Sequence, residues 1–191
     1  MEKVPIQAVE MYRYIDFLSE EECNYCIDLI LKNKQRSVTT RDEVSVVSDF
    51  RTSTTCTMPR DDPVIKDIKK RMCDALHLSS DLMEEIQGQH YEPGQYFKEH
   101  TDFFDPGTPS YEHHTKTNGN RTWTFMIYLN TTENGGSTEF SHINVGFTPK
   151  QGAAVIWNNQ INGELNHNTA HQGMPVESGF KAIITQWFRE K

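Results

Sequence analysis

Cysteine is scarce in this sequence of 191 residues, which contains four. Cys23 and Cys26 form a C-x-x-C pair, the spacing of half a zinc site or of a redox pair. No second C-x-x-C accompanies the pair, so a four-thiolate zinc site is not indicated. Both residues fall at helical spacing, and we interpret all four cysteines as free thiols of a reducing compartment.

Long apolar runs and an excess of basic residues are also absent. No run approaches the roughly 18 apolar residues of a membrane span, and the mean hydropathy is -0.68. The first residues, MEKVPIQAVEMYRYI, lack a basic stretch followed by an apolar one, so no signal peptide is predicted. The net charge of -8 argues against nucleic acid as a partner. We therefore expect a cytoplasmic protein with no membrane or nucleic-acid partner, and the compact chain fits a microbial or viral source.

The stretch from Gln89 to Asp102, QHYEPGQYFKEHTD, ends in an H-x-D triplet that begins at His100. Side chains two residues apart on a β-strand point to the same face, so this imidazole and this carboxylate can converge on one point. One more histidine would complete the two-His, one-carboxylate triad that holds non-haem Fe(II) and leaves open positions. An H-x-D triplet alone occurs by chance in many proteins, so the remaining groups must come from elsewhere in the chain.

Two helices are predicted in the first 86 residues. Ser19 and Glu22 form a capping box at the start of a helix over 19–34. Asp62-Pro63 supplies an N-cap and a proline at the first position of a second helix. Its stripe at helical spacing predicts a side that faces the core, formed by Val64, Ile65, Ile68, Met72 and Leu76. Shorter elements are expected around these helices: a strand or arm within 1–18, a strand at 51–58 and a short helix after Ser80.

From Gly88 onward the apolar period changes to two residues. Strands are expected at 87–98, 121–130, 136–141, 153–157, 167–172 and 180–189. Helices followed by many short strands favour an α+β, mainly β fold, with a double-stranded β-helix (jelly-roll) core and N-terminal helices packed on one sheet. The length suits a single domain over 1–191, with 1–86 as N-terminal support and 87–191 as the core.

Two segments are expected to be loops beside the site. Residues 103–120 combine proline, glycine and asparagine without a period and follow the H-x-D triplet directly, as the lid of an enzyme often does. Residues 36–50 are polar and rich in β-branched side chains, which predicts a strand that leads into a mobile loop.

The third metal ligand has to be chosen among the other histidines. The candidates are His90, His113, His114, His142, His167 and His171. The turn PVESG joins His171 to Lys181, so two adjacent antiparallel strands could bring both side chains to one cavity. Lys181 lies in the apolar run FKAIITQWF, where a lysine is costly unless it is paired or reaches water at a sheet edge. His171 could therefore hold a metal while Lys181 binds the far end of a dicarboxylate, and His167 remains the alternative ligand.

Five segments in order resemble one known family. They are RTST at 51–54, HYEPGQYFKEHTD at 90–102, RTWTFMIYLNTTENGGSTEF at 121–140, PKQGAAVIWN at 149–158 and HQGMPVESGFKAIITQW at 171–187. Together they resemble the prolyl 4-hydroxylases, Fe(II)- and 2-oxoglutarate-dependent dioxygenases. The resemblance covers about 51–189 and implies that the cofactors are Fe(II), 2-oxoglutarate and O₂, with ascorbate as reductant.

The resemblance also implies roles for single residues. His100, Asp102 and His171 correspond to the iron ligands, and Lys181 corresponds to the residue that binds the distal carboxylate of 2-oxoglutarate. Arg121 corresponds to an active-site arginine linked to the peptide substrate. Three further positions correspond to the lining of the co-substrate pocket, namely Tyr91, Tyr128 and Thr185. Trp187 corresponds to an aromatic residue beside the site, although a plain core role explains it equally well.

The implied substrate is a proline-containing peptide or protein. Departures from the family pattern leave other substrates open, since His171 is followed by Gln-Gly-Met where many relatives have Ala-Gly-Cys. The alternatives are the same chemistry on another protein side chain, a free amino acid or a small metabolite, and a non-catalytic cupin-like metal-binding module. The pattern specifies neither the substrate's sequence nor an oligomeric state.

Overall fold

Two antiparallel β-sheets face one another in the computed structural model, which describes residues 1–37, 39–41, 44–46 and 49–191. Within these residues the larger sheet has the order β1 (Glu2–Lys3), β2 (Met11–Tyr14), β13 (Ala154–Asn158), β9 (Arg121–Tyr128), β18 (Lys181–Arg189), β7 (Gln87–Tyr91), β6 (Thr54–Thr57), β3 (Gln35–Arg36). The smaller sheet has the order β12 (Val145–Phe147), β11 (Thr138–Phe140), β16 (His171–Gly173), β8 (Phe97–His100). This arrangement confirms the predicted jelly-roll core.

Three pairs of short strands complete the β-structure of the described ranges. They are β10 (Asn134–Gly135) with β17 (Val176–Ser178), β14 (Gln160–Ile161) with β15 (Glu164–Leu165), and β4 (Thr39–Arg41) with β5 (Val44–Val46). The expected mobile loop over 36–50 includes 38, 42–43 and 47–48, which lie outside the described residues. The division of the domain at residue 86 stays a prediction, and β2 and β6 from the N-terminal part pair directly into the larger sheet.

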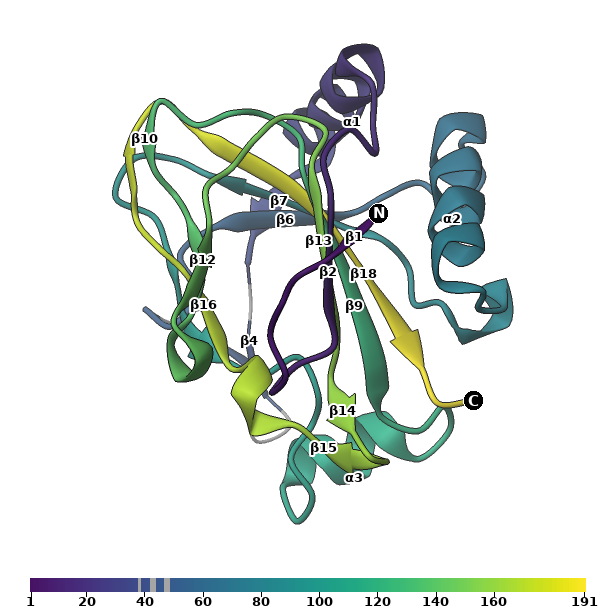
Figure 1. Ribbon diagram of the computed structural model, residues 1–191. Helices are drawn as coiled ribbons and strands as arrows, with labels where there is room; N and C mark the ends of the chain where they lie inside the picture. Colours follow the sequence, from purple (N-terminus) through teal and green to yellow (C-terminus); the bar gives the residue numbers. More distant parts are fainter. Residues whose placement is uncertain (38, 42–43, 47–48) are drawn as a thin grey trace.

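Two helices cover the outer face of the larger sheet, as Figure 1 shows. Helix α1 (Glu20–Asn33) begins at the predicted capping box, because Ser19 Oγ accepts from the Glu22 amide at 3.2 Å and Glu22 Oε2 accepts from the Ser19 amide at 2.8 Å. Helix α2 (Pro63–Leu76) begins after Asp62, which caps it. Both predicted helices are confirmed. No helix of the described part of the chain is long and apolar enough to cross a membrane.

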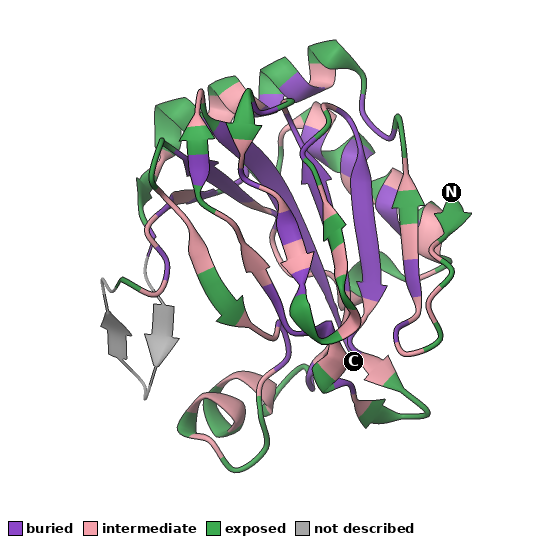
Figure 2. Ribbon diagram, turned by 60° about the vertical axis from the view of Figure 1, so that its left-hand side comes forward, coloured by how far each residue is buried: buried purple, intermediate pink, exposed green. Residues whose placement is uncertain are grey.

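The core has two layers because the central strands alternate. On β9, Phe125 and Ile127 face the helices, whereas Met126 and Tyr128 face the space between the sheets. All nine residues of β18 are buried, and Figure 2 shows buried strands in the middle of the molecule and exposed residues on the outer side of the helix above them. Fully burying one large apolar side chain contributes about 1.5–3 kcal/mol, so these layers hold the sheets and helices together.

Three predicted elements differ from those observed. The expected strand over 87–98 is divided into β7 and β8 by a turn that contains Gly94, whose φ of +81° suits glycine. The late strand begins only at His171, because 167–169 form a 3₁₀ turn, η3 (His167–Thr169). The expected loop over 103–120 contains a helix, α3 (Pro109–Thr115), which Thr108 caps. The remaining 3₁₀ turns are η1 (Ser80–Leu82), where the short helix after Ser80 was expected, and η2 (Ser141–Ile143).

Candidate metal centre

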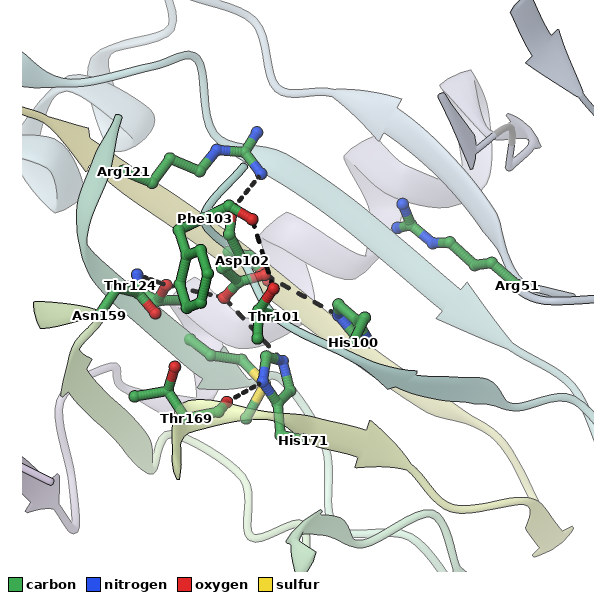
Figure 3. A network of polar contacts seen from close by, with 12 residues as sticks. Arg51, His100, Thr101, Asp102, Phe103, Arg121, Thr124, Asn159, Thr169 and His171 are labelled. Atoms are coloured by element: carbon green, nitrogen blue, oxygen red, sulfur yellow. Dashed lines mark hydrogen bonds and ion pairs between the residues drawn. The ribbon is translucent and has the colours of Figure 1, made fainter. Parts of the chain in front are cut away.

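Three side chains that can bind a metal meet at the end of the smaller sheet. His100 ends β8 and His171 begins β16, and the two are direct cross-strand partners. Asp102 lies just beyond β8, with Oδ1 at 3.8 Å from His100 Nε2 and Oδ2 at 3.9 Å from His171 Nε2. One ligand atom from each residue lies within 4.8 Å of the others, and Figure 3 shows the three side chains pointing toward one another. The structure brings the three residues of the predicted trio together.

Both imidazoles are oriented by backbone carbonyls. Nδ1 of His100 lies 2.8 Å from the carbonyl oxygen of Lys98, and Nδ1 of His171 lies 2.9 Å from that of Thr169. A carbonyl can only accept, so each Nδ1 carries the proton and each Nε2 keeps its lone pair for a metal. Burial and the neighbouring His171 lower the pKa of His100 to about 3, which keeps its ring neutral. Neutral rings of this kind are the form that ligates a metal.

The carboxylate of Asp102 stays ionised although it is buried. Burial works to raise its pKa, but His171, His100, Arg121 and a hydrogen bond from Thr124 together hold the pKa below its usual value. Thr124 Oγ1 donates to Oδ2 at 2.7 Å. Two imidazoles and one carboxylate therefore fit a divalent metal such as Fe(II).

An inner pocket of about 40 Å³ continues from the metal trio toward Lys181. Lys181 is 2% exposed, and burial lowers its pKa to about 7. Among the described residues its Nζ meets no carboxylate or other acceptor, and its nearest aromatic rings are those of Tyr91 at 5.2 Å and Tyr128 at 5.8 Å. A buried amine without a partner is costly, so the pocket suits a small ligand that brings a carboxylate.

A hydrogen-bond chain forms one wall of this pocket. Tyr91 donates its hydroxyl proton to Gln89 Oε1 at 2.8 Å, and Gln89 Nε2 donates to Thr185 Oγ1 at 3.2 Å. Thr138 lines the pocket from the smaller sheet. Its hydroxyl accepts from Tyr128 at 2.8 Å. The polar groups are thereby fixed before any ligand arrives.

An outer cleft of about 820 Å³ opens on the other side of the metal trio. Arg121 lines it, held by Glu84 through bonds of 2.7 and 2.8 Å and stacked 3.8 Å from the centre of the Trp187 ring. Arg51, which is also buried, lines both spaces. Figure 3 shows the two arginines on opposite sides of His100 and Asp102. The difference in volume indicates a small co-substrate inside and a larger substrate outside.

The chain matches the 2OG-Fe(II) oxygenase superfamily over residues 86–189, more than half of its length. It belongs to this family. Probable prolyl 4-hydroxylase 3 of Arabidopsis thaliana is 32% identical over 91% of this chain and 67% of its own length. Prolyl 4-hydroxylase subunit alpha-2 of Gallus gallus is 33% identical over 94% of this chain, which spans only 34% of that relative. Within the superfamily, the oxygenase is thus related to prolyl 4-hydroxylases.

Solved structures of this family share the fold. A viral collagen prolyl hydroxylase from Paramecium bursaria Chlorella virus-1, solved in complex with 2-oxoglutarate, superposes with a TM-score of 0.71 at 28% identity over 94% of this chain and 95% of that one. A prolyl hydroxylase of Trichoplax adhaerens, solved with a peptide of hypoxia inducible factor, is 15% identical and shares the fold with a TM-score of 0.69 over 94% of this chain and 83% of that one. The family pairs Fe(II) with 2-oxoglutarate, in agreement with the geometry of the oxygenase.

The structure places the predicted site residues of the oxygenase in different parts of the site. Lys181, Tyr91 and Thr185 line the inner pocket, and Arg121 lines the cleft. Tyr128 does not line the inner pocket; it lies behind Lys181 and Thr138.

One predicted arrangement is wrong. His171 and Lys181 were expected on adjacent antiparallel strands, but they face the same pocket from opposite sheets, because β17 pairs with β10 between them. His167, the alternative ligand, has a side chain that is 67% exposed and lies beside Asp105 outside the metal trio.

Sequence reasoning missed several residues of the site. Gln89 and Thr138 line the inner pocket, and Glu84 holds Arg121. Gln89 could have been found, because it lies two positions before Tyr91 on the same strand and so shares its face. The pairing of Glu84 with Arg121 joins residues 37 positions apart and has no signal in the sequence.

Proposed function

We propose that the chain hydroxylates prolyl residues at the 4-position in a peptide or protein, with Fe(II), 2-oxoglutarate and O₂, and with ascorbate as reductant. The observation that carries the proposal is the placement of one metal-binding trio between a lysine-containing inner pocket and a wide outer cleft. A pocket that holds a small co-substrate beside a cleft that holds a polypeptide is what this reaction requires. The prolyl 4-hydroxylases among the relatives favour proline as the target.

In this proposal His100, Asp102 and His171 hold the iron, and Lys181 pairs with the distal carboxylate of 2-oxoglutarate. Tyr91 and Thr185 line the co-substrate site, and Tyr128 supports it from behind. Bound together, Fe(II) and 2-oxoglutarate would activate O₂, so that one oxygen atom turns a C–H bond into C–OH and the other ends in succinate, with release of CO₂. The protein's own part is to position the reactants and to exclude water.

Arg121 is proposed to contact the peptide at the mouth of the site. Its guanidinium is fixed by Glu84 and Trp187, and Nη1 also donates to the carbonyl oxygen of Asp102 at 3.2 Å. A group held in this way loses little freedom when substrate binds, which favours a defined orientation of the target residue. Trp187 supplies an apolar surface beside it.

The proposed setting is the cytoplasm of a microbe or of a cell infected by a virus. All four cysteines are free and buried, which suits a reducing compartment. Burial raises the pKa of Cys23 to about 11 and that of Cys26 to about 12, so neither is a reactive thiolate. A putative prolyl 4-hydroxylase of Acanthamoeba polyphaga mimivirus, 32% identical over 75% of this chain and 60% of its own length, supports a viral source.

Succinate formation with Fe(II), 2-oxoglutarate and ascorbate, with and without a panel of proline-rich peptides, tests the proposal. We expect peptide-stimulated succinate and a peptide product heavier by one oxygen atom, located by mass spectrometry on proline. Succinate without a modified peptide would move the search to another side chain, a free amino acid or a small metabolite. Absence of succinate from an iron-loaded protein would favour the non-catalytic metal-binding module.

The metal trio gives a sharper prediction. Asp102→Ala removes the only anionic ligand of the trio, so we expect loss of iron binding and of iron-dependent turnover. Asp74→Ala on the exposed side of α2 serves as the control, since Asp74 pairs with Lys70 at the surface. His171→Ala and His167→Ala, compared by Fe(II) affinity, should lose and retain the metal, respectively. Full turnover by Asp102→Ala would refute the assignment.

A further inference from the structure

A residue of the larger sheet holds the carboxylate of Asp102. Thr124 lies on β9 and is fully buried, and its Oγ1 donates to Asp102 Oδ2 at 2.7 Å. The two histidines of the trio belong to β8 and β16 of the smaller sheet. This hydrogen bond therefore crosses from one sheet to the other at the metal centre, as Figure 3 shows.

Asn159 extends the contact by one further hydrogen bond. It follows β13 directly, is 0% exposed, and its Nδ2 donates to Thr124 Oγ1 at 3.0 Å. Its backbone is fixed on both sides, because its amide donates to the carbonyl oxygen of Thr122 at 2.7 Å and its own carbonyl accepts from the amide of Asn166 at 2.9 Å. The backbone of Asn159 is thus held in place by the fold, and from there its side chain reaches Thr124.

The direction of these hydrogen bonds follows from the charges. A threonine hydroxyl has one hydrogen to donate and can also accept. The strongest acceptor near it is the ionised carboxylate, so the hydrogen points to Asp102 and the amide of Asn159 donates to the hydroxyl oxygen. A donor behind the hydroxyl polarises it and strengthens its bond to the carboxylate.

We propose that Thr124 and Asn159 are positioning residues for the carboxylate that binds iron. The inference rests on the proposed role of Asp102 as a metal ligand. The two residues hold one carboxylate oxygen of Asp102, Oδ2, by a hydrogen bond from the larger sheet, and the other oxygen, Oδ1, is left to bind the metal. Arg121 on the same strand donates to the backbone carbonyl of Asp102, so β9 holds this residue at its main chain and its side chain.

Metal affinity in the absence of any peptide tests the proposal. Co(II) and Fe(II) binding is measured by calorimetry, and the visible spectrum of the Co(II) protein reports the geometry of its ligands. Removal of a hydrogen-bond partner of a metal ligand typically weakens metal binding about 10–100-fold, and we expect this range for Thr124→Val. Thr124→Ser keeps the hydroxyl and should stay within about threefold of the unmodified protein, well below that range.

Two further variants separate positioning from folding. Thr122→Val removes a hydroxyl two residues away on the same strand, one that donates to the carbonyl oxygen of Phe188, and it should leave both metal affinity and spectrum unchanged. Asn159→Ala should weaken metal binding less than Thr124→Val does. In the double variant of Thr124→Val and Asn159→Ala the second change should add little, because both residues act through one hydrogen bond.

The outcomes distinguish this inference from the proposed function. Thr124→Val with the affinity and Co(II) spectrum of the unmodified protein would overturn the positioning role and leave the metal site intact. An unmodified protein that binds no metal would overturn the proposed function as well. If Thr124→Val does not fold, Asn159→Ala decides: weaker binding with a changed spectrum supports the proposal, and unchanged binding contradicts it.

Discussion

Lys181 lies in a strand whose nine residues are all buried, and its amine has no anionic partner among the described residues. Burial lowers its pKa to about 7, so the empty pocket carries a charged lysine below that pH and a neutral one above it. A carboxylate of 2-oxoglutarate stabilises the charged form and raises this pKa again. Above pH 7, binding of 2-oxoglutarate must therefore take up a proton, and the affinity must fall as the pH rises.

This proton uptake is measurable. 2-Oxoglutarate is titrated calorimetrically into the metal-loaded protein at pH 8, in buffers with different heats of ionisation. We expect uptake of nearly one proton for each 2-oxoglutarate bound. Lys181→Met keeps the length of the side chain and should abolish that uptake. Lys181→Ala should mainly raise the KM for 2-oxoglutarate, since it removes a contact present in the ground state. An unchanged KM would point to another residue, of which Arg51 is the nearest candidate in the pocket.

For single residues, the sequence predicts the candidate metal ligands better than it predicts the residues that hold the site in place. His100 ends β8 and Asp102 follows two residues later, so their short spacing in the sequence keeps them close together. Thr124, Asn159 and Glu84 act through partners on other strands, and the register between strands decides those contacts. The register is set by the packing of the whole sheet, so a single sequence does not show it.

At the scale of the elements, α1 packs closely against β7 at Gly88. A Cβ atom there would lie 2.5 Å from Ile30 Cγ1 and 3.0 Å from Met58 Sδ, both in the core. Gly88→Ala should therefore lower the free energy of unfolding by about 1–3 kcal/mol, the usual cost of overpacking. Chemical denaturation checks this value.

Gly146→Ala is the matched control for that change. Its Cβ would lie 3.6 Å from the nearest atom of Glu139, an ordinary contact, so stability should change by less than about 0.5 kcal/mol. Equal effects of the two substitutions would mean that the space beneath α1 accommodates a methyl group. Since β7 also carries Gln89 and Tyr91, displacement by Gly88→Ala should raise the KM for 2-oxoglutarate.

The segment 103–120 shows why one element was not predicted. Its helix α3 has seven residues, too few for a helical period, and none of them is buried. Asn120 bonds the backbone of Phe104 from both atoms of its amide, and Arg189 donates to the carbonyl oxygen of His114. The bond from Arg189 fastens the segment to β18, whereas the bonds of Asn120 join its two ends. Thr108 and Pro109 supply an N-cap and a proline as Asp62 and Pro63 do for α2, but only the longer helix adds an apolar period to that signal.

At the scale of the whole molecule, the proposed metal and 2-oxoglutarate sites would join the two sheets. His100 and His171 belong to the smaller sheet, and Lys181 belongs to the larger one. A ligand that reaches from the metal to Lys181 therefore binds only the assembled jelly roll and stabilises it by mass action. The change of the apolar period at Gly88 predicted the two-sheet core. That His171 and Lys181 face the pocket from opposite sheets depends on the pairing of β17 with β10, which the sequence did not predict.

Because such a ligand would bind both sheets, its binding should raise the Tm. Metal together with 2-oxoglutarate, each at about 100 times its Kd, should stabilise the fold by at least about 2.7 kcal/mol, which raises the Tm of a chain of this size by roughly 5–10 °C. 2-Oxoglutarate alone should give a much smaller rise, because only the lysine end of its site is then available. Asp102→Ala should abolish the metal-dependent part, and Lys181→Met should reduce only the part due to 2-oxoglutarate. An equal rise in Asp102→Ala would mean that the ligands bind elsewhere and do not join the sheets.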